Sequence, residues 1–448
     1  MDAAELDRRA RTSDGWIPTW IVSLLVEHGH VDEVRRQAED GDWFCARKVA
    51  ELLDEDEALG VLRPFVDSGW WDAARTVALL LEERGRPEEA LALVRTRMDG
   101  REWRAVPLLA ELLARQGRID EVIALLGPRT ANQSYAQALV ELTEGHRRDD
   151  EVAGLLPPVE AGCQCPAFWG DAWNATELTA RVLERQGRVD EAVALLRPAV
   201  TCCGGKYVNV VEQLADVLAR HGRETELREF IAGDGGDDAA HRLAKWLAEQ
   251  GRVDEAVGVL RPFVDEGSPN AAWETAELLR RNGRIDEAIE VLRPEPGCGD
   301  DWIVHGLGNL LAGQGRADEA LAVIDAIAEA NGGMPAEFFP QRVGLLVRSG
   351  RQEQALAELR AHPDADNSYV AGELTKILIG LGRLDEAAEF LESGPLTGGH
   401  VTDLAHVRIL QGCVEEAVTL LTGRATVPVV RGHTPTDPDD PWSAGPPF

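Results

Sequence analysis

Residues Ala271–Arg293 read AAWETAELLRRNGRIDEAIEVLR. Small and apolar residues recur with helical spacing in both halves, at Ala272, Ala276 and Leu279 and then at Ile285, Ala288, Ile289 and Leu292. Gly283 separates the halves, and a glycine directly after the last periodic residue is typical of a helix end. The acidic pair Asp286–Glu287 then falls in the first turn of the next helix, where negative charge is favoured. The stretch therefore predicts an antiparallel helical hairpin.

The same glycine, followed by acidic residues, recurs along most of the chain. Twelve copies are found, at Gly29, Gly85, Gly117, Gly145, Gly187, Gly222, Gly251, Gly283, Gly315, Gly350, Gly382 and Gly412. A thirteenth copy at Leu52–Pro64 lacks the glycine. The spacing is mostly 28 to 35 residues, and 32 residues occurs four times. Self-similarity at this period predicts a solenoid in which each hairpin buries its apolar face against its neighbours.

The repeated GRxDEA segment and the apolar residues after it resemble the second helix of the tetratricopeptide repeat. Ala288 matches the small residue of that helix, and the small residue of the first helix is matched by Ala78, Ala110, Ala180, Ala244, Ala276 and Gly308. The resemblance covers roughly residues 16–423. It departs from the family where leucine replaces a late aromatic residue of the first helix, as at Leu279 and Leu311. It implies an all-α, right-handed superhelical solenoid of about 12–13 antiparallel hairpins.

Three segments are expected along the chain. Residues 1–15 read as an N-terminal capping helix, residues 16–423 as the solenoid, and residues 424–448 as a proline-rich tail that is extended or disordered. Between Gly145 and Gly187 about ten extra residues predict a long loop.

A recurrent Leu-Arg-Pro motif lies near the end of several second helices. It ends at Pro64, Pro198, Pro262 and Pro294. Proline removes one backbone hydrogen bond and crowds the carbonyl four residues earlier. We therefore expect these second helices to be kinked or short.

The composition is strongly acidic. Asp plus Glu number 78 against 46 Lys plus Arg, which gives a net charge of −32. Such a chain repels phosphate backbones and anionic lipid, so neither nucleic acid nor a membrane is an expected partner, and RNA binding by the related 35-residue repeats, which needs a basic groove, is disfavoured. The charge either solvates a large surface or forms an acidic groove for a basic partner.

The expected location is the cytoplasm. The N-terminal residues lack the layout of a secretory signal, and no window approaches eighteen consecutive apolar residues. Seven cysteines, an odd number in a long helical chain, are consistent with reduced thiols in that compartment.

Tryptophan supplies the candidate binding residues. In the family that the chain resembles, the inner groove is lined by the first helices, and its second and fifth positions correspond here to Trp16, Trp43, Trp273, Trp302, His241, His305 and Asn270. These residues predict an aromatic groove for an extended peptide or another flat apolar group. The alternative is that the rings pack between hairpins as core, with Trp71, Trp103 and Trp173 as its first members.

Four cysteines form a second candidate site. Cys163 and Cys165 lie in the predicted long loop, and Cys202 and Cys203 lie in the equivalent loop one repeat later. Four thiolates from stacked loops can hold zinc, but CxC and CC spacings are not those of zinc knuckles, so reduced thiols are the alternative.

No catalytic motif accompanies the repeats. The chain has no HExxH, GxSxG or Walker lysine motif, so we expect neither an enzyme nor a cofactor. The sequence favours a non-catalytic scaffold that binds a partner protein or peptide on a Trp-lined, acidic concave surface. The alternatives are a sensory receptor that encloses a signal peptide or small ligand and, less favoured, an enzyme with a site built from loops. The sequence does not specify an oligomeric state.

Overall fold

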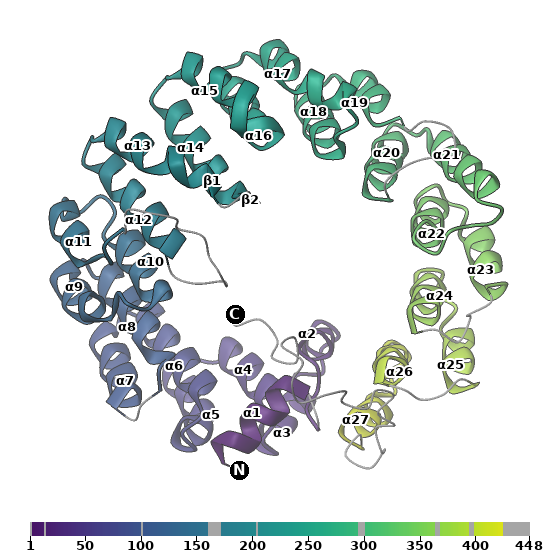
Figure 1. Ribbon diagram of the computed structural model, residues 1–448. Helices are drawn as coiled ribbons and strands as arrows, with labels where there is room; N and C mark the ends of the chain where they lie inside the picture. The colour runs from purple at the N-terminus through teal and green to yellow at the C-terminus, as the bar shows by residue number, and fades with distance from the viewer. Residues whose placement is uncertain are drawn as a thin grey trace, which may run out of the picture. The chain divides into compact units, whose positions relative to one another are not determined.

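The computed structural model describes residues 2–12, 15–99, 102–159, 172–202, 205–293, 301–362, 368–393 and 398–423. Helices dominate this part of the chain, which confirms the all-α prediction (Figure 1). After the short α1, the helices α2 to α27 pair in sequence order into thirteen antiparallel hairpins. The predicted tail and most of the predicted long loop lie outside the described residues.

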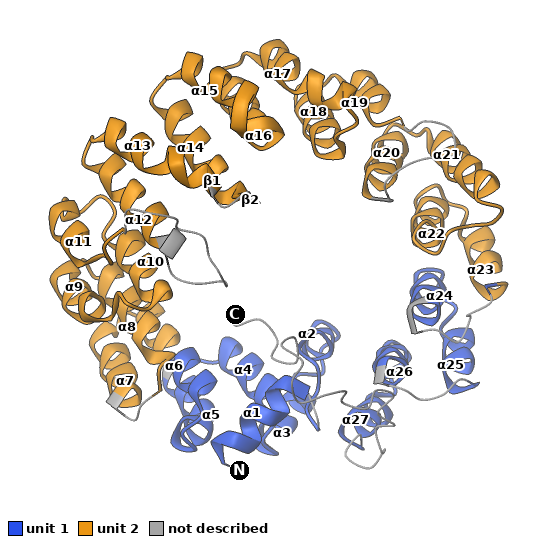
Figure 2. Cartoon of the chain, viewed as in Figure 1, with its two compact units in different colours: residues 1–77, 362–448 blue, residues 78–361 orange. Residues whose placement is uncertain are grey.

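The chain forms two compact units, residues 1–77 with 362–448 (unit 1) and residues 78–361 (unit 2), which Figure 2 colours separately. The helices of unit 1 are α1 (Ala3–Thr12), α2 (Thr19–Glu27), α3 (Val31–Glu39), α4 (Trp43–Leu52), α5 (Glu55–Asp67), α24 (Ser368–Gly380), α25 (Leu384–Ser393), α26 (Gly398–Leu410) and α27 (Val414–Thr422). Helix α6 (Trp71–Glu83) carries the boundary between the units.

The remaining elements belong to unit 2. Its helices are α7 (Pro87–Asp99), α8 (Ala105–Arg115), α9 (Ile119–Leu126), α10 (Gln133–Leu142), α11 (Asp149–Leu155), α12 (Ala172–Arg185), α13 (Val189–Val200), α14 (Val208–Arg220), α15 (Glu224–Phe230), α16 (Gly236–Glu249), α17 (Val253–Asp265), α18 (Pro269–Arg281), α19 (Ile285–Leu292), α20 (Asp301–Gly313), α21 (Ala317–Ala330), α22 (Phe339–Arg348) and α23 (Gln352–Arg360). A 3-10 turn (Gly127–Arg129), a π turn (Ile231–Gly235) and two antiparallel two-residue strands, β1 (Thr201–Cys202) and β2 (Gly205–Lys206), complete it.

The repeated glycines close the first helix of each hairpin as predicted. All twelve have a positive φ, between 65° and 82°. At Gly283 the glycine N–H donates to the carbonyl of Arg280, and the next N–H, of Arg284, donates to the carbonyl of Leu279. This is the bond pattern of a left-handed helix end, and it explains why the position requires glycine. In the copy without a glycine, α4 ends in an extended residue, Leu53, and the side chain of Asp54 caps the start of α5 by accepting from the N–H of Glu57.

The small residues predicted in the first helices lie where neighbouring hairpins meet. Ala110, Ala180 and Ala244 are at most 1% exposed. At Gly308, an added Cβ would lie 3.6 Å from the Leu345 side chain, which is ordinary contact. These positions confirm the close helix approach that the resemblance implies.

The Leu-Arg-Pro helices differ from the prediction. Helices α5, α13 and α17 contain Pro64, Pro198 and Pro262 and continue two or three residues beyond them. The proline carbonyls still accept helical bonds, from Ser68 directly after α5 and from Glu266 directly after α17. Because proline lacks only its own N–H, a proline in the last turn costs one bond and does not shorten the helix. Pro294 lies outside the described residues, but α19 ends at Leu292, two residues before it, in agreement with the prediction of a short helix.

Arginine side chains join successive repeats across unit 2. In seven repeats, an arginine one to three residues after the hairpin glycine reaches an acidic residue at the start of the preceding second helix, in the pairs Arg118–Glu88, Arg148–Asp120, Arg223–Asp190, Arg252–Glu224, Arg284–Asp254, Arg316–Asp286 and Arg351–Asp318. We call this set the arginine ladder.

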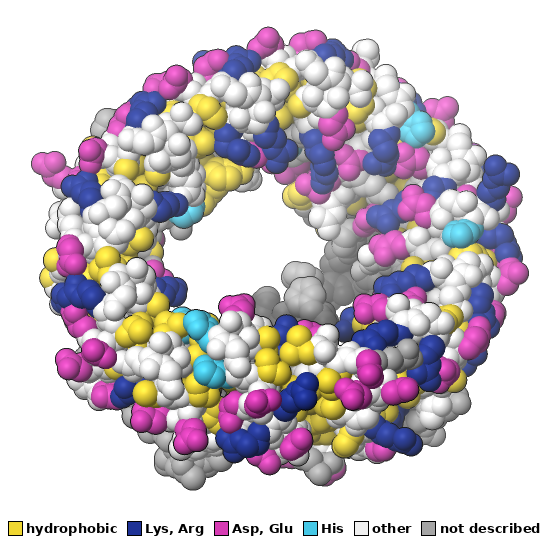
Figure 3. Space-filling model, turned by 180° about the vertical axis from the view of Figure 1, so that it is seen from behind, with side chains coloured by type: hydrophobic (Ala, Val, Ile, Leu, Met, Phe, Trp, Pro, Cys, Tyr) yellow, Lys and Arg dark blue, Asp and Glu magenta, His cyan; other side chains and the backbone are white. Residues whose placement is uncertain are grey.

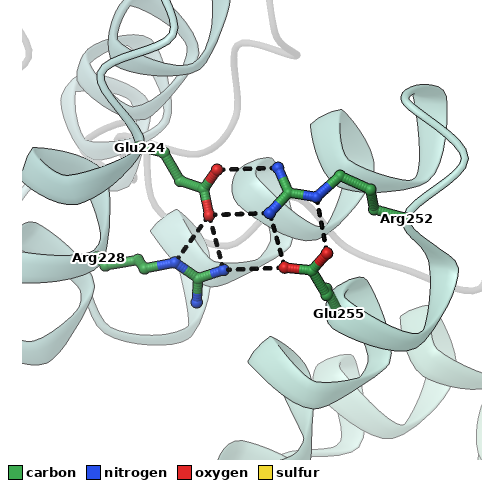
Figure 4. Close-up of polar contacts among 4 residues, drawn as sticks. All are labelled: Glu224, Arg228, Arg252 and Glu255. Carbon is green, nitrogen blue, oxygen red and sulfur yellow. Dashed lines mark hydrogen bonds and ion pairs between the residues drawn. The ribbon is translucent and has the colours of Figure 1, made fainter.

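Most of these arginines also bind a glutamate of their own helix. Arg252, for example, bonds Glu255 at 2.6 Å and Glu224 of the previous repeat at 2.9 Å, and Arg228 joins the same cluster (Figure 4). The acidic pair of the repeat motif therefore links hairpins, in addition to its place at a helix N-terminus.

Unit 1 brings the two ends of the chain together. The indole of Trp20 on α2 contacts the imidazole of His406 on α26, with ring centroids 5.4 Å apart. Helix α1 is anchored in the same unit, because Leu6 is 1% exposed and Asp7 accepts a hydrogen bond from the indole of Trp70 at 2.8 Å.

Charged side chains of both signs are interspersed on the face of the molecule in Figure 3. Among the described residues, no helix combines the length and the apolar character that crossing a membrane requires.

Candidate functional site: the first-helix groove

The candidate site is a groove on the first helices of unit 2. These helices line the inner side of the arc that unit 2 forms in Figure 2. Ten and six residues before the hairpin glycine, α12 carries Glu177 and Arg181, and α14 carries Glu212 and Asp216. All four side chains line an open groove of about 750 Å³, which we call the first-helix groove.

Most of the groove is lined by ionisable groups. Its described lining includes five carboxylates and four arginines, contributed mainly by α12, α14 and α16. Arg185 is committed to the fold, because it binds Asp149 and donates to the carbonyl of Val140. The other three arginines face the five carboxylates, so the groove carries an excess of negative charge.

One carboxylate of the groove is fully paired. Arg220 donates to both oxygens of Glu184 at 2.9 Å, and the imidazole of His221 lies 3.0 Å from the same carboxylate. Burial favours the neutral form of Glu184, but the bonds from Arg220 and His221 outweigh it and lower its pKa. Glu184 therefore remains ionised and holds α12 to α14.

Two carboxylates are poorly compensated. Burial raises the pKa of Glu177, and the only opposing cation is Arg181, at 3.5 Å. Burial also raises the pKa of Asp216, although Arg242 at 3.5 Å, Arg220 and Lys245 oppose the shift, and Arg242 lies closer to Glu212, at 2.7 Å. Both groups would be stabilised as carboxylates by an additional positive charge.

Two polar atoms on the same face are buried without a partner. Gln213 on α14 donates from Nε2 to the backbone carbonyl of Glu177 at 2.8 Å, but its Oε1 has no hydrogen-bond partner in the described part of the chain. The Nε2 atom of His241 on α16 is in the same state. Buried polar atoms are normally satisfied, so each is a candidate contact for a bound group.

The structure corrects the expectation for two predicted groove residues. Trp16 and Trp43 are only 1% and 3% exposed and pack with Trp70, at centroid distances of 5.9 and 4.9 Å. The Trp16 indole donates to the carbonyl of Gly41. These rings form the core of unit 1 because three indoles bury far more apolar area together than a groove wall would.

Trp273 and Trp302 lie together between α18 and α20. Both are half-buried, and their ring centroids are 5.6 Å apart. The Trp273 ring lies directly over Gly306, where an added Cβ would come within 2.1 Å of it. Trp273 also lines a small pocket of about 210 Å³ with apolar neighbours such as Leu292 and Leu310. Their role in binding stays a prediction.

The other predicted residues fall on the surface or are partly covered. His305 and Asn270 are exposed, and His241 is half-buried beside the groove helices. Among the tryptophans assigned to the core, Trp71 is 4% exposed, but Trp103 is 69% exposed, so its assignment was wrong. Trp103 precedes α8, outside the helical packing. The side chain of Trp173 lies outside the described residues.

The proposed cysteine site is not tested. Cys202 belongs to β1, whereas Cys163, Cys165 and Cys203 lie outside the described residues. Within the described residues, no group of three or more metal-binding side chains occurs.

The groove residues Glu177 and Glu212 were missed by sequence reasoning, although a usable signal existed. Both stand ten residues before a hairpin glycine, the position at which His241, Trp273 and His305 were singled out. The aromatic and histidine residues at that position indicated a binding role, and a carboxylate at the same position of the repeat faces the same groove.

Comparisons with known proteins agree with the repeat architecture. Residues 241–295 match one model described as the tetratricopeptide repeat, and residues 71–96, 107–128, 173–198 and 302–326 match a second model with the same description. No curated protein matches the chain.

Two solved structures share low overall similarity with the chain. One, titled "Structure of Naa15/Naa10 bound to HypK-THB", is 15% identical with a TM-score of 0.33, over 91% of this chain and 69% of that chain. The other, the pentatricopeptide repeat protein PPR10 from maize, is 15% identical with a TM-score of 0.31, over 94% and 75% of the two chains.

Proposed function

Because the chain belongs to the tetratricopeptide-like helical-repeat proteins, we propose that it is a scaffold that binds an extended segment of a partner protein in the first-helix groove. The observation that carries the proposal is the groove of about 750 Å³ between α12, α14 and α16. It is open and crosses successive first helices, so an extended peptide can lie across several repeats.

The chemistry of the groove supports binding rather than catalysis. Its described lining consists of carboxylates, arginines, two amides and one histidine, and it includes no serine or cysteine nucleophile. The histidine, His221, is held by Glu184 and faces no nucleophile within that lining. We therefore propose a non-catalytic role, with a partner whose bound segment is basic, in keeping with the net charge of −32.

The proposal extends to the half-buried ring pair further along the array. Trp273 and its pocket of about 210 Å³ lie two first helices beyond α14, on α18. A pocket of this size accepts one apolar side chain of the partner segment. His241, on the intervening α16, would contact the segment between the two sites.

The test begins with a random library of peptides of about twelve residues, which span roughly 40 Å when extended. Peptides that bind the full chain are selected. Each is then cross-linked to two variants of the chain, which carry a benzophenone amino acid at one of two positions. Asn209 is exposed on α14 and lines the groove, whereas Ala194 is exposed on α13, the second helix of the neighbouring repeat.

Efficient cross-linking from position 209 and little from position 194 is the expected result. Failure to select any peptide, or equal cross-linking from both positions, would refute binding in the groove.

A further inference from the structure

The first-helix groove has fewer available arginines than carboxylates. Arg220 is used by Glu184, and Arg242 binds Glu212 more closely than Asp216. Arg181 is shared, because it lies 3.5 Å from Glu177 and 3.7 Å from Glu141. Two carboxylates that face one groove, Glu177 on α12 and Asp216 on α14, therefore each share their nearest arginine with another carboxylate.

Gln213 joins the two helices that carry these carboxylates. It lies one helical turn from Asp216 on α14, and its Nε2 donates to the backbone of Glu177 on α12. Its Oε1 is buried and accepts no hydrogen bond from the described residues. Gln213 Oε1 could therefore accept a hydrogen bond from a bound group, and the two carboxylates would be stabilised by an additional positive charge.

We propose that the first-helix groove binds a cationic side chain, a lysine or arginine of the partner segment, against Glu177, Gln213 and Asp216. This inference rests on the function proposed above and names the chemistry of the bound segment.

A cationic side chain satisfies all three groups at once. An ammonium or guanidinium group carries several N–H donors, so it can pair with both carboxylates and donate to Gln213 Oε1. Because the groove is partly buried, such a pair is screened less by salt than a surface pair. A phosphate or a carboxylate of a ligand would instead be repelled by Glu177 and Asp216, whose charges are only partly compensated, which argues against an anionic partner.

The test compares two double variants that remove the same charge. E177Q/D216N neutralises the groove carboxylates, whereas D190N/D254N neutralises two ladder residues that are about 90% exposed on second helices. E177Q/D216N should fold, because burial already disfavours the charge at both positions. Circular dichroism of each full-length variant verifies its helical content.

The ligand is a lysine-containing peptide from the library selection, together with the same peptide carrying norleucine at that lysine. Loss of charge-assisted hydrogen bonds predicts that E177Q/D216N weakens binding of the lysine peptide by about tenfold or more. The norleucine peptide should bind the wild-type chain as weakly as the lysine peptide binds E177Q/D216N. Its affinity should be no lower for E177Q/D216N than for the wild type. D190N/D254N should bind both peptides as the wild type does.

The outcomes separate this inference from the function on which it rests. If no peptide is selected, the proposed groove binding fails. If peptides bind and cross-link at position 209 but their affinity is unchanged by E177Q/D216N, only the cation site fails. Equal weakening by D190N/D254N would show a long-range effect of net charge and would also overturn the site.

Discussion

Asp42 is a buried carboxylate that joins two hairpins of unit 1. It is 4% exposed, caps α4 by accepting from the N–H of Cys45 at 2.9 Å, and accepts from the N–H of Ile17 at 2.6 Å through its other oxygen. Burial raises its pKa despite these two bonds. Both oxygens are used, so no neutral side chain of the same shape reproduces the site.

We predict that D42N destabilises unit 1 by about 1–3 kcal/mol, because the new NH₂ group faces an N–H that has lost its acceptor. The measurement is urea unfolding followed by tryptophan fluorescence. The control is D54N, at an exposed cap that bonds only Glu57, where asparagine caps as well as aspartate. Equal losses in the two variants would contradict the role assigned to Asp42.

The raised pKa of Asp42 also predicts a pH dependence. The folded state holds the proton more tightly than the unfolded state, whose aspartate titrates near its ordinary pKa of about 3.9. The contribution of Asp42 to stability is therefore largest below that value and falls as the pH rises through the raised folded pKa. The difference in unfolding free energy between wild type and D42N should follow this direction.

Trp273 and Gly306 form a contact that tolerates no added atom. An added Cβ at Gly306 would lie 2.1 Å from the Trp273 ring, so we predict that G306A displaces the indole and destabilises the α18–α20 packing. The double variant W273A/G306A should lose less stability than the sum of the single variants, because removing the ring removes the clash. G308A is the control, since its Cβ would make only an ordinary contact with Leu345.

Thermal unfolding measures all four variants. Full additivity of W273A and G306A would show that the ring and the glycine do not interact. A partner peptide that binds W273A as well as wild type would separately assign Trp273 to packing alone.

These side chains show which residues could be read from the sequence. The hairpin glycines were predictable, because a left-handed helix end requires glycine at a fixed place in every repeat. The burial of Trp16 and Trp43 was not, because it depends on Trp70, which approaches from a different hairpin. The groove carboxylates could be located from their fixed distance before the hairpin glycine. Which cation each of them binds depends on distances between neighbouring helices, which the sequence does not give.

Among the helices, the arginine ladder uses the acidic residues of the repeat motif in two ways, within one helix and between successive repeats. Arg284 binds Glu287 within its own helix at 2.7 Å and Asp254 of the previous repeat at 2.6 Å. The sequence of one repeat predicts the acidic pair only at a helix N-terminus, because the arginine that it also binds belongs to the next repeat. Each link is a surface ion pair and therefore weak individually, so its effect should appear when several are removed together.

We predict that R252Q/R284Q/R316Q lowers the unfolding temperature at low ionic strength, and that the difference shrinks between about 0.05 M and about 0.5 M salt. The control triple variant R63Q/R261Q/R281Q removes the same charge from pairs within single helices. Since those pairs join no repeats, their loss should have a smaller effect. Equal, salt-independent effects would rule out a role of the ladder in coupling hairpins.

The Leu-Arg-Pro helices show the limit of a local rule. Proline was expected to kink or shorten them, but α5 and α17 run to Asp67 and Asp265 and are not shortened. The residues four before these prolines are Gly60 and Gly258, and in both cases the space beside the glycine is open. The effect of a proline on helix length depends on how far it lies from the helix end. The helix end is determined by packing, which the Leu-Arg-Pro motif alone does not reveal.

For the chain as a whole, unit 1 combines hairpins from the beginning and the end of the sequence, so its stability depends on contacts that no single repeat contains. Its residues come from the first and the last hairpins, which meet where Trp20 contacts His406. Burial lowers the pKa of His406, and the nearby His28 acts in the same direction, whereas Asp403 opposes both. His400, Asp403 and Lys376 are the other charged or titratable groups on this side.

The sign of the pH effect follows from the lowered pKa of His406. When the ends separate, the imidazole regains an ordinary pKa of about 6.5 and binds a proton more readily than in the contact. The contact is therefore fully stabilised above that value and weakens as the pH falls through it. Burial also raises the pKa of Asp403, which acts in the opposite direction, because the stabilisation it gives is lost as the pH rises through its raised pKa.

We predict that W20A increases hydrogen exchange in α26 and α27 at about pH 7.5, and that the wild-type chain shows a similar increase at about pH 5.5 once intrinsic exchange rates are corrected. The indole covers His406, so its loss removes the ring contact between the two ends. W103A is the matched control, because Trp103 is 69% exposed and belongs to unit 2. If W20A leaves exchange in α26 unchanged, the two ends do not stabilise each other, and unit 1 would then consist of two independent hairpin stacks.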